Sequence, residues 1–478
     1  MFAPISADEG GFLAIARAWR HGGTLYSDIW VDRPQGLIVL YRLFDTFSAG
    51  NEDGVRVLAL LAGVVAVVAV AEFVRLLSNP TAGVAAGVLT AVLSSAPAIE
   101  GFAANGELLG GTCSAVALAL GARVLSDRGR PGWMFAAGVA GGLGMSMKQS
   151  GIDGVAALLA FLALAAMLGW MPRGIALHRL AQVLAGAASV VLLMALHGLL
   201  TGWSQWVYAV NGYRMEQRSV FVEAEWGRLG QTWHDAWPVL TPPLLMATVI
   251  GVGAAVSGIL TGRVAVMPGT VPRGPVLLGL WCVTALASFV SGGQFFHHYW
   301  VILSLPIAAA SGLAIGLLSR RRIRIAVCTA VIAPAMWSWG SLAVLSRDEI
   351  PVTISGYGRS VQEERVGHWF ADTAAPGESI YVMCASASVY AHADSDPPYP
   401  YLWFDNVHHV PGAMDRLADM LEEPGRPTYV AVFQRAGACD WSGRAGEMLE
   451  RSYHRLTVVD GVSIFVAGQP AIDPLLTG

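Results

Sequence analysis

Long apolar runs without a formal charge are the feature that most limits what this chain can fold into. Residues 57–71, 155–169 and 181–200 are such runs. About 20 consecutive apolar residues cross a bilayer, and in lipid only a helix satisfies the backbone of such a run. Of all residues, 13% are charged, roughly half the share in soluble domains. A water-soluble single core is therefore excluded, and the fold class predicted is an all-α polytopic membrane protein.

Ten membrane spans are predicted from the apolar segments. Every second connection between them carries arginine, which places those connections in the cytoplasm. The opposite side then receives residues 1–53, the junction at Lys148, the loop 202–237 and everything after residue 346. We therefore expect any chemistry to face outward. The spans are expected at roughly 54–77, 81–97, 108–125, 132–147, 151–169, 177–201, 238–260, 275–292, 299–318 and 324–345.

Residues 346–478 differ from the preceding part because charges return there. We predict two domains, a membrane domain over 1–345 and a small extracytoplasmic α/β domain over 346–478. Helices are expected at 361–373 and 413–423, and strands at 379–383, 428–433 and 462–467. Cys384 and Cys439 both fall in the exported domain, where a disulfide is permitted, although spacing alone leaves their pairing open.

The segment 6–23 has the pattern of an amphipathic helix at the membrane surface. Ser6 and Glu9 form a capping-box pattern, and Gly22–Gly23 ends the helix. Asp8 and Glu9 fall in its first turn, where the helix dipole favours carboxylates, so one interpretation is that they only cap the helix. The apolar stretch that follows, within 24–44, is too short for a span and is expected to be interfacial or re-entrant.

Four motifs in order carry a family resemblance. They are Asp8-Glu9 followed by Tyr26-x-Asp28-x-x-x-Asp32-Arg33-Pro34-x-Gly36, then AANGELL at 103–109, GLGMSMKQSG at 142–151, and QFFHHYWVILSLP at 294–306. Together they resemble the GT-C superfamily of glycosyltransferases, in the branch of protein O-mannosyltransferases and the lipid A aminoarabinose transferase. Two departures stand out. The family's helix before the Asp-Glu loop is missing from this sequence, either because the true start lies upstream or because the first span carries the segment across. In addition, Arg33-Pro34-Gln35 replaces the family's Lys-Pro-Pro.

The resemblance implies an inverting glycosyltransferase of the bacterial cytoplasmic membrane. It would move a hexose or pentose from a polyprenyl-phosphate donor to an extracytoplasmic glycan, glycolipid or protein, with membrane lipid as its other partner. No cofactor is certain, and participation of a divalent cation is left open. The candidate site residues are Asp8 as base with Glu9 assisting it, Arg33, Lys148, His298 and Tyr299 for the donor phosphate, and Asp28, Asp32, Asn105 and Glu107 for substrate.

Each motif also has a structural interpretation without function. Lys148, the only lysine, would snorkel at the end of a span, and Glu107 would simply begin a helix. His297 and His298 are adjacent and so share no helical face, which argues against a metal site formed by these two alone. The tryptophans of 202–237 suit an interfacial belt as well as a surface that stacks on sugar or prenyl chain.

Other function classes fit the sequence less well. A transporter or lipid permease is the main alternative, but it is expected to contain inverted repeats and broken helices, and no repeat is evident. A non-catalytic scaffold would not explain why Asp8, Asp28 and Lys148 occur together in one sequence. The net charge of −4 gives no indication of a nucleic-acid surface.

Topology provides the first test. The alternation of basic loops places residues 350–478 outside, so a Ser395→Cys variant should react with a membrane-impermeant maleimide in intact cells. Modification only after lysis would contradict the predicted topology and the outward-facing chemistry.

Overall fold

A computed structural model describes most of the chain. The described residues are 4–126, 128–130, 132–217, 222–260, 273–383, 386–434, 440 and 442–468. The candidate disulfide partners Cys384 and Cys439 lie outside them.

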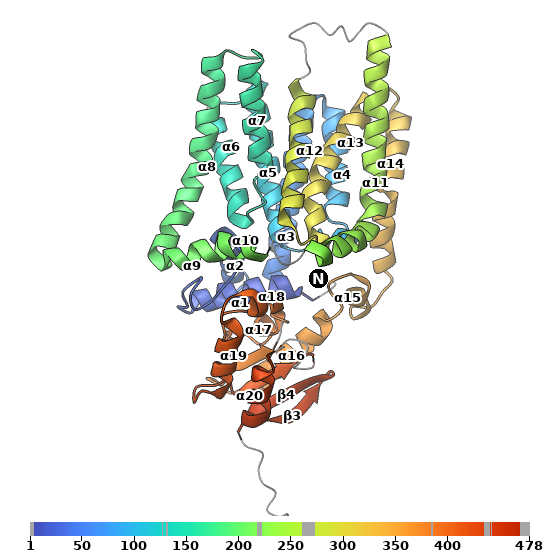
Figure 1. The fold of residues 1–478 in the computed structure, drawn as a ribbon. Helices are drawn as coiled ribbons and strands as arrows, with labels where there is room; N and C mark the ends of the chain where they lie inside the picture. The colour runs from blue at the N-terminus through green and yellow to red at the C-terminus, as the bar shows by residue number, and fades with distance from the viewer. Residues whose placement is uncertain are drawn as a thin grey trace, which may run out of the picture.

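A helical bundle forms the membrane domain, and each of the ten predicted spans corresponds to one helix (Figure 1). Seven helical segments are long and apolar enough to cross a membrane, whereas α4, α6 and α7 are apolar but shorter. The fold class predicted from the apolar runs is therefore confirmed. The ten helices are α3 (Asp53–Leu77), α4 (Pro80–Leu93), α5 (Gly106–Leu125), α6 (Trp133–Met147), α7 (Asp153–Met167), α8 (Arg173–Thr201), α11 (Val222–Leu260), α12 (Arg273–Gly292), α13 (Trp300–Leu317) and α14 (Arg321–Leu342).

A layer of short helices lies across one end of the bundle (Figure 1). It contains α1 (Ala7–Arg20), α2 (Gln35–Phe47), α9 (Trp203–Val207) and α10 (Tyr213–Gln217), with a π-helical turn over Tyr208–Gly212. The non-spanning assignment of the segment after α1 is thus correct, because α2 runs across the bundle end. The loop 202–237 is helical throughout its described part.

Helix α1 corrects one expectation. Its bounds and its Ser6–Glu9 capping box are as predicted, but it does not lie with one face in solvent. Residues 9–18 are all buried, because α1 packs between α2 and the C-terminal domain. The amphipathic pattern did not predict burial on all sides of α1. The face expected to be polar also contains glycine and alanine, and these small residues allow other segments to pack closely against it.

The C-terminal domain lies beyond this layer (Figure 1). Its four-stranded sheet has the order β1-β2-β4-β3, with β1 and β2 parallel and the other pairs antiparallel. The strands are β1 (Ile380–Met383), β2 (Tyr429–Val432), β3 (Tyr453–Val459) and β4 (Val462–Ala467). The helices are α15 (Glu349–Thr353), α16 (Ser360–Thr373), α17 (Ser388–His392), α18 (Phe404–His409), α19 (Ala413–Glu422) and α20 (Arg444–Ser452).

Three strands and two helices of this domain agree with the sequence prediction. Strand β3 was missed because four of its seven residues, His454 to Thr457, are polar or largely exposed. It therefore lacks the apolar run that marks β1, the other edge strand, and β2.

Two adjacent glycines allow α1 to dock against the C-terminal domain. A Cβ on Gly10 would overlap Ser388 of α17, and one on Gly11 would lie 2.6 Å from the Trp403 ring. Arg17 fastens the same junction, since its guanidinium donates to Asp45 Oδ1 at 3.0 Å and to the Ala391 carbonyl at 2.8 Å. One hydrophobic core runs through the bundle end, α1 and the sheet.

This docking predicts that Gly10→Ala is destabilising. The added methyl group must push α1 from α17, and overpacking of this kind costs about 1–3 kcal/mol. We expect a lower thermal midpoint in detergent and faster proteolytic release of the C-terminal domain. Gly63→Ala in α3 is the matched control, because a Cβ there meets no atom within 4 Å. Equal behaviour of the two variants would contradict close docking.

Candidate active site

A polar cavity of about 310 Å³ lies where the bundle meets the layer of short helices. Four side chains with cationic or phenolic groups line it, each from a different part of the chain: Arg33, Lys148, Arg214 and Tyr299. Three of these four were predicted from sequence as donor-phosphate ligands. Gln149, Gln217 and Gln294 add amide groups to the wall.

Asp32 organises the arginines of this cavity. Its Oδ2 accepts from Arg33 Nη1 at 2.7 Å and also forms an ion pair with Arg214 of α10. Burial alone would raise the pKa of Asp32, but Arg214, Arg33 and Lys148 outweigh that effect and hold its pKa below the ordinary value. One buried carboxylate therefore orients two guanidinium groups at a cavity that Lys148 and the acid Glu225 also line.

Lys148 reaches the cavity because α6 ends directly before it. Its backbone is extended, and Gly106 allows close approach, since a Cβ there would lie 3.0 Å from the Lys148 Cβ. The ammonium group forms an ion pair with Glu107 and lies 3.5 Å from the centroid of the Tyr299 ring. The side chain is 6% exposed. Lys148 thus points inward, and the geometry does not fit the snorkelling interpretation.

Glu107 and His298 form further polar contacts next to Lys148. His298 Nε2 lies 3.7 Å from Glu107 Oε1, and its Nδ1 lies 3.0 Å from Glu100 Oε2. Asn105 caps α5 through its Oδ1, which accepts from the Leu108 backbone at 2.9 Å. The buried Nδ2 of Asn105 has no hydrogen-bond partner among the described residues. A buried donor without a partner costs free energy, and a ligand atom that accepts a hydrogen bond from it would remove that cost.

Asp8 is half-buried in the first turn of α1. Its Oδ1 accepts a hydrogen bond of 2.9 Å from the indole Nε1 of Trp403, which belongs to the C-terminal domain. In the part of the chain that the structure describes, no hydrogen bond to Oδ2 is found. Asp8 thus has an oriented carboxylate with one oxygen available.

Glu9 occupies a different environment from its neighbour. It is 1% exposed, and its two oxygens accept from four donors. Oε1 accepts from Arg56 Nη1 at 2.8 Å and from the Ala104 backbone at 3.0 Å, whereas Oε2 accepts from the Ser6 backbone at 3.0 Å and the Tyr357 hydroxyl at 3.4 Å. With every acceptor position taken, Glu9 is suited to positioning Asp8 and not to proton transfer.

Asp28, predicted from sequence to bind substrate, lies apart from the cavity residues. It is exposed, and it closes a turn by accepting from the Thr24 backbone N–H at 2.8 Å. No described contact joins Asp28 to the cavity residues. Its position is explained by local turn formation.

Several residues of the site were not predicted from the sequence. Arg214 and Gln149 line the cavity, Glu100 holds His298, and Trp403 holds Asp8. Gln149 follows Lys148 directly, so the motif itself contained that signal. Arg214 lies in an aromatic loop and Trp403 in another domain, and no sequence spacing links either residue to Asp8.

Among the described residues, no group of three or more histidine, cysteine or acidic side chains is arranged to hold a metal ion. His297, next to His298, pairs instead with Asp235, whose Oδ2 lies 2.8 Å from Nε2.

The fold and the cavity together define a class. Residues 32–194 match the sequence model of the family described as dolichyl-phosphate-mannose-protein mannosyltransferase, a region that includes Asp32, Asn105, Glu107 and Lys148. No curated protein matches the chain in sequence. The architecture is a GT-C fold, the fold class that the motifs predicted.

Particular solved structures show this likeness. ArnT from Cupriavidus metallidurans bound to undecaprenyl phosphate superimposes with a TM-score of 0.62 at 13% identity, over 98% of this chain and 96% of that one. Its apo state gives a TM-score of 0.59 at 14% identity, over the same shares of the two chains. The oligosaccharyltransferase AglB from Archaeoglobus fulgidus, in complex with an inhibitory peptide and a dolichol-phosphate, gives 0.56 at 14% identity, over 98% and 71%.

The four donors around Glu9 predict that replacing its carboxylate by an amide destabilises the protein. In Glu9→Gln the side-chain amide would face N–H and O–H donors only, so at least one buried hydrogen bond and the ion pair with Arg56 are lost. Breaking a buried pair in this way costs about 3 kcal/mol or more. We expect a clearly lower thermal midpoint in detergent. Glu450→Gln, an exposed change in α20, is the control, and equal midpoints would show that Glu9 is not required for the junction.

Proposed function

We propose that the chain is an inverting membrane glycosyltransferase that takes a sugar from a polyprenyl-phosphate donor. One observation carries the proposal: three cations, Arg33, Lys148 and Arg214, line a single cavity at the end of the bundle where α1 places Asp8. The likeness in fold to proteins solved with undecaprenyl phosphate and dolichol-phosphate supports this choice of donor.

The cations suit a departing phosphate. In the proposed step the acceptor hydroxyl oxygen bonds to the anomeric carbon, and the bond from that carbon to the phosphate oxygen breaks. The electron pair leaves with the phosphate, whose charge is stabilised by preorganised cations in a site of low dielectric constant. Arg33 and Arg214 are held by Asp32 for this purpose, while Lys148 is held by Glu107.

Asp8 is the proposed general base. The acceptor's proton passes to its available Oδ2 while the Trp403 indole keeps Oδ1 in place. A base that accepts a proton in the transition state contributes about 10²–10⁴-fold in rate. Glu9 positions Asp8 through the capping box and its tie to α3. Asn105 Nδ2, an unpaired donor, is proposed to bind donor or acceptor.

The remaining assignments are part of the same proposal. The acceptor is an extracytoplasmic glycan, glycolipid or protein, the transferred sugar is a hexose or pentose, and the membrane is a bacterial plasma membrane with the C-terminal domain outside. The step is written without a metal ion, and transfer assays with and without EDTA test whether a divalent cation also takes part. The alternative of a transporter gains no support from the comparisons.

Two variants should separate chemistry from donor binding. Asp8→Asn keeps the size of the side chain and can still accept from Trp403, but it removes the basicity, so turnover should fall by about 10²–10⁴-fold with donor binding retained. Lys148→Ala should instead weaken donor binding by about tenfold or more, the size of a charge-assisted hydrogen bond. The measurements are transfer from a labelled polyprenyl-phosphate sugar and binding of the same donor by purified protein.

Two controls make this result interpretable. Asp372→Asn, an exposed change in α16, controls for loss of a carboxylate far from the cavity. The double variant Lys148→Ala/Glu107→Gln removes both charges, so a binding defect that persists there is not caused by an unpaired buried Glu107. Full transfer by Asp8→Asn would refute the assignment of the base.

A further inference from the structure

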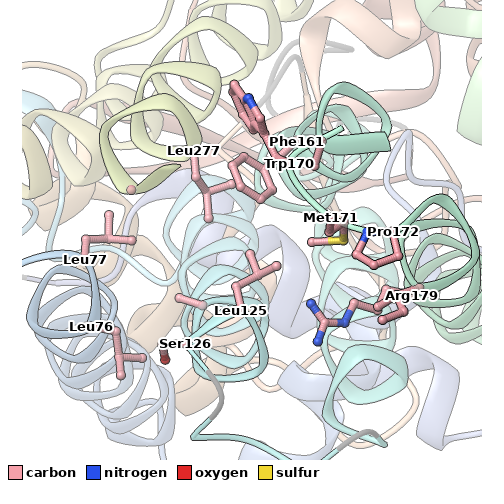
Figure 2. Close-up of a pocket in the computed structure, with 14 residues that line it drawn as sticks. Leu76, Leu77, Leu125, Ser126, Phe161, Trp170, Met171, Pro172, Arg179 and Leu277 are labelled. Carbon is pink, nitrogen blue, oxygen red and sulfur yellow. The ribbon is translucent and has the colours of Figure 1, made fainter. Parts of the chain in front are cut away.

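A second cavity lies at the end of the bundle away from the C-terminal domain. Its volume is about 370 Å³, and Figure 2 shows the side chains that line it. They come from the C-terminal ends of α3, α5 and α7 and from the beginnings of α8 and α12. The cavity therefore occupies a seam between membrane helices, at the level of the connections rather than in the middle of the bundle.

Most residues that line this cavity have apolar side chains. Leu76, Leu77, Leu125, Phe161 and Leu277 surround the space, so this part of it suits a hydrocarbon chain. Phe161 belongs to a packed apolar cluster that includes the buried Trp281, and Leu77 packs against the same cluster. No step of the proposed sugar transfer uses this cavity.

Arg179 supplies a cation at the same cavity. Figure 2 shows its guanidinium pointing into the space beside Leu125. Within the described part of the chain, Arg179 has no hydrogen bond, ion pair or aromatic contact. Other arginines at this end differ, because Arg75 and Arg123 both pair with Glu72 at 2.6 and 2.7 Å. Arg179 is thus a half-buried cation with open donor positions next to an apolar space.

The surroundings favour an anionic ligand. Apart from Glu72, the charged side chains described near this end are basic. They are Arg75, Arg123, Arg128, Arg130, Arg173 and Arg179, with Arg320, Arg321, Arg322 and Arg324 before α14. Basic pockets between membrane helices attract anionic headgroups by electrostatics, while the acyl chain gains from leaving the polar interface.

We infer that this cavity binds an anionic phospholipid of the surrounding bilayer. The phosphodiester accepts hydrogen bonds from the Arg179 guanidinium, and one acyl chain lies along the leucines and Phe161. A soluble phosphate would leave the apolar walls empty. A zwitterionic lipid would bring its own cation toward the basic cluster and should bind less well.

Lipid retention by the intact protein tests this site. The full chain is purified from nanodiscs of phosphatidylglycerol, of phosphatidylcholine, or of an equal mixture, and retained lipid is measured by native mass spectrometry. The wild type should retain phosphatidylglycerol in preference to phosphatidylcholine. Arg179→Gln should reduce this preference about five- to tenfold, as expected for loss of a charge-assisted interaction. Arg173→Gln, an exposed change at the start of α8 that does not line the cavity, should reduce it far less.

A second variant tests the apolar part. Leu125→Trp should fill the space and lower retention of both lipids, whereas Arg179→Gln should lower only that of the anionic one. Equal retention of the two lipids by the wild type, or equal effects of Arg173→Gln and Arg179→Gln, would overturn the inference. The measurement needs no sugar transfer, so it can fail while the proposed function stands, and the reverse also holds.

Discussion

The buried carboxylate of Glu9 is the interaction on which the rest of the structure depends. It joins the start of α1 to Arg56 in α3, to the backbone before α5, and to Tyr357 between α15 and α16 of the C-terminal domain. Three parts of the chain thus converge on one side chain. A buried charge is costly unless paired and hydrogen-bonded, so the four donors fix the position of α1 closely. The geometry of Asp8, one residue earlier, follows from that position.

The two cavities show how one bundle separates two kinds of chemistry. At the end covered by α1, buried acids such as Asp32 and Glu107 each hold cations, and the cavity is polar. At the other end, Arg179 has no described acid beside it and the walls are leucines and aromatic rings. The first arrangement fixes several charges relative to one another, whereas the second leaves one cation beside an apolar space. Both follow from where the helices end.

The sequence predicted the helical bundle well because burial in lipid leaves the apolar runs few alternatives. It also predicted that Arg33, Lys148 and Tyr299 lie near one another, since their motifs were expected on one side of the membrane, and all three line one cavity. It could not predict that α1 is buried, because a helix rich in glycine and alanine shows no sign of what packs against it. Strand β3 was missed because polar or exposed residues take the place of the apolar run that marks β1 and β2. Arg214 and Trp403 depend on contacts between distant segments, and no periodicity records such contacts.

The hydrogen bond between Trp403 and Asp8 spans 395 positions of the chain. During synthesis the N-terminal helix emerges first, yet the partner of its carboxylate is made only when the C-terminal domain follows. A partly synthesised chain therefore lacks the hydrogen bond that orients Asp8. The geometry of this carboxylate is completed only when the C-terminal domain has been made and has docked on α1.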